Sequence, residues 1–504
     1  MTTLIFGVLH GWSMANPWGE GQALWWLQLL AMAYGVQRLA RATHLRSALW
    51  TGALFGVAWF TSSMWWLYTS LHDYGHLASP IAALAVLALC SLLASFYALA
   101  GMGFVWLKSA GGDRPLHDAT LFAALWLLAE LARGVVMTGL PWGAAGYAHI
   151  DGPLARAAPW VGVYGISALA AWIAALFVLT RSCALKIGII LILCLKAVST
   201  GAPQSPPSGG LMVRVLQGNI PQNEKFDAPT GIRTALDWYK TELLQAAADR
   251  VDLVVTPETA IPLLPQQLPI GYWPALHDAL ARSAHTAALI GMPLSADSGN
   301  YSNSVIGLAG SNAPPSRPYR YDKHHLVPFG EFVPPLFRWF IDLMHIPLGD
   351  FQAGALAQPS WAVHGQQLAP TICYEDLFGE EMAARFTPAS TAPTVLVNMS
   401  NMGWFGSGVA VDQHLHISRM RTLEFDRPMI RATNTGATAI ITHQGQVTHR
   451  LARATRAVLT GWVTGRTTIT PYARWVSAYG LAPLWALAGG WVLWVWIRQR
   501  RRPS

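Results

Sequence analysis

The sequence predicts a membrane protein that combines about eight membrane-spanning α-helices with one water-soluble α/β domain. Of the 504 residues, 53% are hydrophobic and only 12% are charged, which is about half the roughly 25% of soluble domains. The charges gather in the middle: residues 201–473 carry 19 Lys or Arg and 20 Asp or Glu, whereas residues 1–200 carry 10 and 6. Long apolar segments occur on both sides of this middle region, as a soluble domain held between membrane spans requires.

The composition also excludes other classes of protein. Disorder requires low hydrophobicity and high charge, and a disulfide scaffold requires more than four Cys in a chain of this length. The net charge of +8 is typical of a nucleic-acid binder only if it lies on the folded domain. Because residues 201–473 carry a net charge of −1, we expect no nucleic-acid partner.

Apolar segments mark the expected spans. A first short span is expected at 2–15, because this stretch lacks the basic start of a signal peptide. The other expected spans are 22–37, 48–70, 80–107, 117–137, 159–180, 186–200 and 475–497. Most of them reach the roughly 20 residues that a helix needs to cross a bilayer.

Lys and Arg alternate between the loops, and this pattern predicts the orientation. Loops 71–79 and 138–158 contain together a single basic residue, Arg156. The basic segments are 38–47, 108–117, 181–186 and the tail after 497. Because basic loops stay in the cytoplasm, we expect both termini in the cytoplasm and the soluble domain in the periplasm.

The expected domain boundaries follow from these segments. Residues 1–200 form the membrane domain of seven helices, and 201–210 is a linker rich in Pro, Gly and Ser. Residues 211–470 form the soluble domain, and 471–504 hold the last span and the Arg-rich tail. Strands are expected at 211–217, 251–258, 287–292, 301–308, 368–373, 394–398 and 437–442, with helices at 230–249 and 274–284. Strands that alternate with helices predict an α/β domain.

Three reactive side chains lie at or beyond expected strand ends, where α/β folds place their sites. Cys373 is a candidate nucleophile, but a cysteine with a pKa near 8.5 needs a base to become a thiolate. Glu258 can accept that proton if burial raises its pKa. Lys323 can stabilise the oxyanion of a tetrahedral intermediate. Each residue alone is weak evidence, since a lone Cys at a strand end more often belongs to the core.

Longer motifs surround these residues. They are Pro-Glu-Thr-Ala at Glu258, Lys-His-His-Leu-Val-Pro-Phe-Gly-Glu-Phe-Val-Pro from Lys323, Ile-Cys-Tyr-Glu-Asp at Cys373 and Asn-Met-Ser-Asn-Met-Gly-Trp-Phe-Gly from Asn398. With these motifs the sequence resembles the apolipoprotein N-acyltransferase family, a membrane-embedded branch of the nitrilase (carbon–nitrogen hydrolase) superfamily. The resemblance covers nearly the whole chain. It implies that the soluble domain is an αββα sandwich.

The resemblance also implies roles for individual residues. Glu258 is the general base, Lys323 the oxyanion stabiliser and Cys373 the nucleophile. Glu331 matches an essential second glutamate of the family, and Tyr374 and Glu375 match catalytically important neighbours. The substrate-binding candidates are Phe226, Phe329, Phe332, Trp339 and Trp404. Phe226 departs from the family, where a Trp is common.

The implied reaction is ping-pong. Cys373 takes an acyl chain from the sn-1 ester of a phospholipid, typically phosphatidylethanolamine. The resulting thioester passes the chain to the N-terminal amine of an S-diacylglyceryl-cysteine apolipoprotein, the last step of lipoprotein maturation. No cofactor is expected. No metal is expected either, because His324, His325, His414 and His416 lack a third ligand at zinc spacing.

Two other functions remain open at this level. A membrane-tethered amidase or nitrilase would use the same three residues with water as acceptor, although eight spans exceed what a tether needs. A transporter or receptor with a ligand-binding outer domain would have no use for an ordered Glu–Lys–Cys set.

Overall fold

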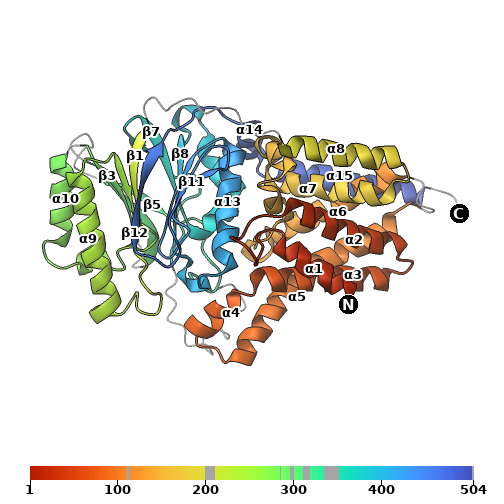
Figure 1. The fold of residues 1–504 in the computed structure, drawn as a ribbon, viewed down its shortest axis with the longest axis horizontal. Helices are drawn as coiled ribbons and strands as arrows, with labels where there is room; N and C mark the ends of the chain where they lie inside the picture. Colours follow the sequence, from red (N-terminus) through yellow and green to blue (C-terminus); the bar gives the residue numbers. More distant parts are fainter. Residues whose placement is uncertain are drawn as a thin grey trace. The chain divides into compact units, whose positions relative to one another are not determined.

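The computed structural model describes residues 1–109, 114–198, 210–283, 285–295, 300–309, 318–333 and 351–501. The chain divides into two compact units, one made mainly of helices and one that contains the strands (Figure 1). The first comprises Met1–Tyr68, Ala78–Gln204 and Ala478–Ser504, and the second comprises Thr69–Leu77 and Ser205–Ser477. The predicted linker lies outside the described residues, except for Gly210.

The first unit contains a helix at each position where a span was predicted. These helices are α1 (Thr2–Trp12), α2 (Trp25–Arg41), α3 (Leu45–Met64), α5 (Ser79–Leu107), α6 (Pro115–Arg133), α7 (Ala158–Leu179), α8 (Cys183–Val198) and α15 (Ala482–Arg500). Buried aromatic rings pack between them: Trp59 of α3 lies 4.7 Å from Tyr97 of α5 and 5.6 Å from Trp126 of α6, between ring centroids.

Fewer of these helices than predicted are long and apolar enough to cross a bilayer. Within the described part of the chain, Ser79–Leu107 and Pro153–Leu179 meet both requirements. A third span results if α14 (Pro471–Tyr479) and α15 are counted together as one broken span. Helices α2 and α8 have only 17 and 16 residues, short of the roughly 20 that a span requires. The predicted number of eight spans is therefore not confirmed.

The second unit is built around two β-sheets. In the described residues each sheet has six strands, in the orders β12-β1-β2-β3-β4-β5 and β11-β10-β9-β8-β7-β6. The strands of the first sheet are β1 (Leu211–Gln217), β2 (Leu253–Val255), β3 (Ala287–Ser295), β4 (Tyr301–Ala309), β5 (Tyr319–Asp322) and β12 (Ala457–Val463). Those of the second are β6 (Trp361–Val363), β7 (Gln366–Ile372), β8 (Val395–Ser400), β9 (Met429–Thr433), β10 (Ala439–Ile441) and β11 (Val447–Arg450).

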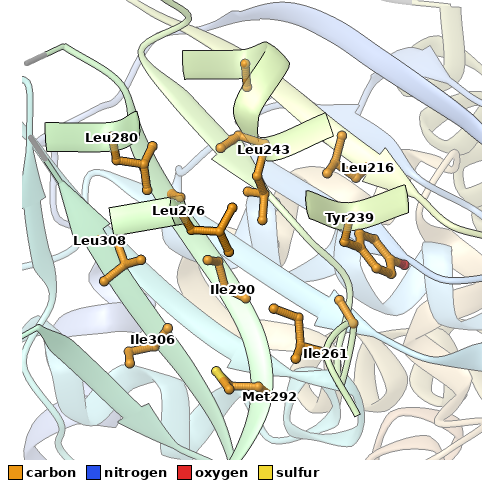
Figure 2. Close-up of a cluster of buried hydrophobic side chains, with 14 of the residues drawn as sticks. Leu216, Tyr239, Leu243, Ile261, Leu276, Leu280, Ile290, Met292, Ile306 and Leu308 are labelled. Atoms are coloured by element: carbon orange, nitrogen blue, oxygen red, sulfur yellow. The ribbon is translucent and has the colours of Figure 1, made fainter. Parts of the chain in front are cut away.

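Helices cover both sides of the paired sheets. Figure 1 shows α9 (Arg233–Ala248) and α10 (Tyr272–Ser283) on one side and α13 (Val409–Phe425) on the other. Leu243 of α9 and Leu276 of α10 pack against Ile290 of β3 and Ile306 of β4 (Figure 2). The αββα order implied by the family resemblance is thus confirmed.

A second apolar layer joins the two sheets. Successive residues of a strand point to opposite faces, so Val213 and Val215 of β1 face the partner sheet while Leu216 faces the helices. Val397 of β8 and Ile430 of β9 belong to the same inter-sheet core. Strands β1, β2 and β3 run parallel, as do β7, β8 and β9. The loops that follow parallel strands therefore meet at one edge of the sandwich.

Candidate active site

The three predicted reactive residues follow strands of both sheets. Glu258 lies three residues after β2, and Lys323 directly follows β5 in the first sheet. Cys373 directly follows β7 in the second sheet. Its backbone has a φ of +52°, a left-handed conformation that costs energy for a residue with a side chain and that is concentrated at functional sites. The base and the cation thus come from one sheet and the thiol from the other.

Lys323 lies between two carboxylates. Its Nζ is 2.9 and 3.0 Å from the two oxygens of Glu331 and 3.4 Å from Oε1 of Glu258. Lys323 is almost completely buried, and both glutamates are buried as well. Burial acts to lower the pKa of Lys323, but the charges of Glu331 and Glu258 prevail and raise it above its usual value. The lysine therefore keeps its positive charge throughout the physiological pH range.

Two asparagines that were not predicted hold the carboxylates in place. Asn303 of β4 donates from Nδ2 to Glu258 at 2.8 Å and to Glu331 at 2.7 Å. The backbone N–H of Asn401 donates to the second oxygen of Glu258 at 2.8 Å. The predicted strand 301–308 offered only a weak signal for Asn303, because Ser302 and Ser304 make its first half polar as well. Asn401 belongs to the family motif that begins at Asn398, but its side chain gave no hint of this contact, because its backbone N–H binds Glu258.

Cys373 is a protonated thiol in this environment. Burial and, to a lesser extent, the charge of Glu258 raise its pKa to about 12, although the charge of Lys323 acts to lower it. Its carbonyl oxygen faces His414 of α13 at 3.1 Å. A thiol with this pKa is a poor nucleophile, so reaction requires a base that removes its proton as the bond to carbon forms. Glu258, whose charge acts on the thiol, is the expected base.

Glu375 and Tyr374 support the loops around the site. One oxygen of Glu375 accepts hydrogen bonds from the Tyr321 hydroxyl at 2.8 Å and from the backbone N–H of His324 at 2.7 Å. Its other oxygen accepts from the backbone N–H of Ile372 at 2.6 Å. Glu375 thus ties the start of the Lys323 loop to the end of the Cys373 strand. Tyr374 is buried, and its ring lies 5.3 Å from that of Phe378.

The predicted substrate-binding aromatics lie in different surroundings. Phe226 is 58% exposed and Trp404 is 41% exposed. The Trp404 ring lies 5.6 Å from that of Tyr74, and its carbonyl accepts a 2.6 Å hydrogen bond from Ser70. Phe329 and Phe332 are half-buried in the turn that carries Glu331, whose Oε2 accepts from the Val327 N–H at 2.8 Å. Trp339 lies outside the described residues.

The four histidines that were considered as metal ligands have protein partners. His324 contacts the carbonyl of Gly354, His325 contacts Glu381, His414 contacts the carbonyl of Cys373, and His416 contacts Arg419. Three other residues, Asp252, His285 and His364, have possible ligand atoms that all lie within 4.8 Å of one another. In that group His285 Nε2 already lies 2.7 Å from Asp252, and His364 Nε2 lies 2.6 Å from the His285 carbonyl. The absence of a metal stays a prediction.

Comparison with known proteins places this geometry in a family. The family model described as apolipoprotein N-acyltransferase N-terminal domain matches residues 7–176, and the carbon-nitrogen hydrolase model matches residues 212–471. An apolipoprotein N-acyltransferase of Verminephrobacter eiseniae is 52% identical over an alignment that covers 99% of this chain and 96% of that protein. The chain belongs to the apolipoprotein N-acyltransferase family.

Other apolipoprotein N-acyltransferases are similar over the same length. That of Ralstonia nicotianae is 42% identical over 99% of this chain and 93% of its own. That of Pseudomonas aeruginosa is 36% identical over 95% of this chain and 93% of its own. Because these alignments run through both the helical unit and the sandwich, the family assignment applies to the whole chain.

Proposed function

We propose that this apolipoprotein N-acyltransferase carries an acyl chain on Cys373 between two membrane-bound substrates. The donor is the sn-1 ester of a phospholipid, with phosphatidylethanolamine as the expected headgroup. The acceptor is the α-amine of an S-diacylglyceryl-cysteine at the N-terminus of an apolipoprotein. The observation that carries the proposal is the buried cluster of Glu258, Lys323 and Glu331, whose charges act on Cys373.

In the first step Cys373 attacks the ester carbonyl of the phospholipid. Glu258 takes the thiol proton as the sulfur–carbon bond forms, and Lys323 stabilises the oxyanion. The tetrahedral intermediate collapses with loss of the lysophospholipid alkoxide, which takes the proton from Glu258. The products are a thioester on Cys373 and a lysophospholipid.

In the second step the acceptor amine attacks the thioester. Glu258 removes a proton from the attacking nitrogen, and Lys323 again stabilises the oxyanion. The intermediate expels the Cys373 sulfur, which recovers its proton from Glu258, and the amide of the triacylated lipoprotein leaves. A thioester suits this sequence because it keeps the acyl chain activated while one lipid leaves and another enters.

The lipid nature of both substrates supports a site held at the membrane. We propose that residues 1–200 supply seven spans, that 211–470 form the catalytic domain in the periplasm, and that 471–504 return the chain to the cytoplasm. The alternation of basic and non-basic loops supports this orientation. Phe226, Phe329, Phe332, Trp339 and Trp404 are the proposed apolar contacts for the lipid chains.

Acyl transfer to the enzyme tests the proposal directly. The purified protein is incubated with phosphatidylethanolamine that carries a fluorescent sn-1 acyl chain. We expect label on the wild-type protein that neutral hydroxylamine removes, and none on Cys373→Ala. Unlabelled wild type, or equal label on the variant, would contradict the proposal.

The fate of the label separates transfer from hydrolysis. A synthetic diacylglyceryl-cysteine peptide should discharge the labelled enzyme, with the fluorescent chain recovered as an amide on the peptide. A peptide whose amine is acetylated is the matched control and should leave the thioester in place. Equal discharge by buffer alone would instead favour an amidase-like hydrolase.

A further inference from the structure

Lys225 is a second buried lysine beside the candidate nucleophile, and the reaction described above gives it no role. It is only 3% exposed, although it precedes the exposed Phe226. Its Nζ donates a 3.2 Å hydrogen bond to the backbone carbonyl of Glu258. Its charge also interacts with Glu258 and with Cys373. A lysine is rarely buried unless it is paired, so its position requires an explanation.

The loop that carries Lys225 is held to the second sheet by side-chain amides. Asn434 accepts from the Ile220 N–H at 3.0 Å and donates to the Ile220 carbonyl at 2.8 Å. Asn401 donates to the side chain of Gln222 at 2.7 Å. These bonds attach the loop to the same asparagine whose backbone N–H binds Glu258.

Gly231 keeps this loop closed on its other side. A Cβ at that position would lie 1.8 Å from the carbonyl oxygen of Glu224 and 3.0 Å from Cα of Lys225. Only glycine allows so close an approach of two backbone segments. Lys225 is therefore fixed in place by the loop rather than free to leave the site.

The charges around Cys373 show what Lys225 contributes. Glu258 and Glu331 bring two negative charges, and Lys323 offsets only one of them. The remaining negative charge opposes formation of a thiolate on Cys373. The other charged or titratable groups that act on this thiol or its carbonyl include Arg431 of β9 and His414 of α13. With Lys225 included, the two glutamates and the two lysines carry no net charge, and Arg431 is a further cation that acts on the thiol.

We propose that Lys225 is a positioning residue that holds the Glu258 backbone and stabilises the developing Cys373 thiolate by its charge. This inference rests on the proposed function of Cys373 as nucleophile. Its contribution depends on pH in a defined direction. Burial lowers the pKa of Lys225 to about 8, so the stabilising charge is present below pH 8 and is lost as the pH rises above it.

The rate of Cys373 alkylation by iodoacetamide tests this role without any lipid. The rate is followed by mass spectrometry of the Cys373 peptide between pH 6 and pH 10. At pH 7 we expect Lys225→Met to react about tenfold more slowly than wild type, as a thiol pKa raised by about one unit requires. The difference should shrink above pH 8, where the wild-type lysine loses its charge.

Lys225→Arg provides the decisive comparison, because arginine stays charged to pH 10. Its rate should remain within about threefold of wild type at pH 7 and should exceed that of Lys225→Met at pH 10. Lys240→Met, which removes a lysine from α9 that lies over the Tyr272 ring, should react like wild type. If Lys225→Met does not fold, the pH profiles of Lys225→Arg and wild type still test the proposal, because only the arginine should keep its charge above pH 8.

Two results would overturn the inference. One is a ratio of wild-type to Lys225→Met rates that is constant over the pH range, since a purely structural role has no such dependence. The other is a Lys225→Arg profile that matches Lys225→Met. Failure of the proposed function looks different: phospholipid would then leave Cys373 unlabelled, whereas the alkylation ratios would still report on Lys225.

Discussion

At the scale of single residues, the two glutamates around Lys323 have unequal roles. Glu331 binds the ammonium with both oxygens, at 2.9 and 3.0 Å, whereas Glu258 lies 3.4 Å away. The closer carboxylate balances the charge of the lysine. The more distant one, Glu258, acts more strongly on Cys373 than Glu331 does and is the expected acceptor of its proton.

Replacement of Glu331 by Gln should make the reaction sensitive to alkaline pH. Burial acts to lower the Lys323 pKa, and two carboxylates raise it. Of these two, Glu331 has the larger effect. Without it the pKa falls, and the lysine loses its charge as the pH rises. We expect kcat to decrease by about 10²–10³ at alkaline pH, the range for loss of one oxyanion contact, with partial recovery toward pH 6.

The pH profile of single-turnover acylation measures this effect. Wild-type Lys323 should stay protonated up to pH 9, so above pH 8 wild type should show only the smaller decrease expected from loss of the Lys225 charge. Glu331→Asp keeps the charge and is the matched control, so its profile should keep the wild-type shape even if its rate is lower. A Glu331→Gln profile parallel to wild type would mean that Glu331 acts only through the loop that it caps.

At the scale of elements, β3 and the Glu258 loop approach each other more closely than side chains allow. A Cβ on Gly291 of β3 would lie 2.2 Å from the Pro257 carbonyl oxygen and 3.1 Å from Cα of Glu258. The N–H of Gly291 also donates a 2.9 Å hydrogen bond to the Thr256 hydroxyl. The position of the base thus depends on a residue without a side chain in the neighbouring strand.

Gly291→Ala should therefore displace Glu258, although it replaces none of the reactive residues themselves. We expect kcat for acylation to fall at least tenfold, since small misplacements of catalytic groups are costly, and thermal stability to decrease. Gly188→Ala, at a helical position with open space around its would-be Cβ, is the control. Wild-type acylation by Gly291→Ala would show that the loop relaxes without effect on the base.

The elements were predictable where the apolar pattern was strong. Strands expected at 211–217, 287–292 and 301–308 correspond to β1, β3 and β4. By contrast, α13 was not predicted, because it is buried on nearly all sides and yet carries Asp412, His414 and Arg421. Strand β9 was also missed, since Arg431 interrupts its apolar run. Polar side chains that are buried hide the hydrophobic periodicity from which helices and strands are predicted.

The residues of the candidate active site were also only partly predictable from the sequence. Glu258, Lys323 and Cys373 stand at or beyond strand ends, where chemistry is expected, and they lie in long motifs. Asn303 and Lys225 lie among residues of ordinary composition, and their roles depend on contacts with Glu258 from distant parts of the chain. No local pattern records such contacts.

At the scale of the whole molecule, the predicted orientation can be tested by thiol labelling. Cys183 is exposed in the basic segment 181–186, and Asp73 is exposed in the segment without basic residues. In a background without the other cysteines, a membrane-impermeant maleimide should label Asp73→Cys in intact spheroplasts. It should label Cys183 only after the membrane is permeabilised. Labelling of Cys183 before permeabilisation would reverse the proposed topology.

The division of the reactive residues between the two sheets has a consequence for biosynthesis. Base and cation come with β2 and β5, but the thiol follows β7, and Asn401 and Asn434 emerge later still. A nascent chain that ends after β5 does not yet contain Cys373, and β12, which completes the first sheet, follows every strand of the second. A chain that has reached Cys373 holds an ordinary cysteine until the second sheet packs on the first. We therefore expect the site to become reactive only when folding of the sandwich is nearly complete.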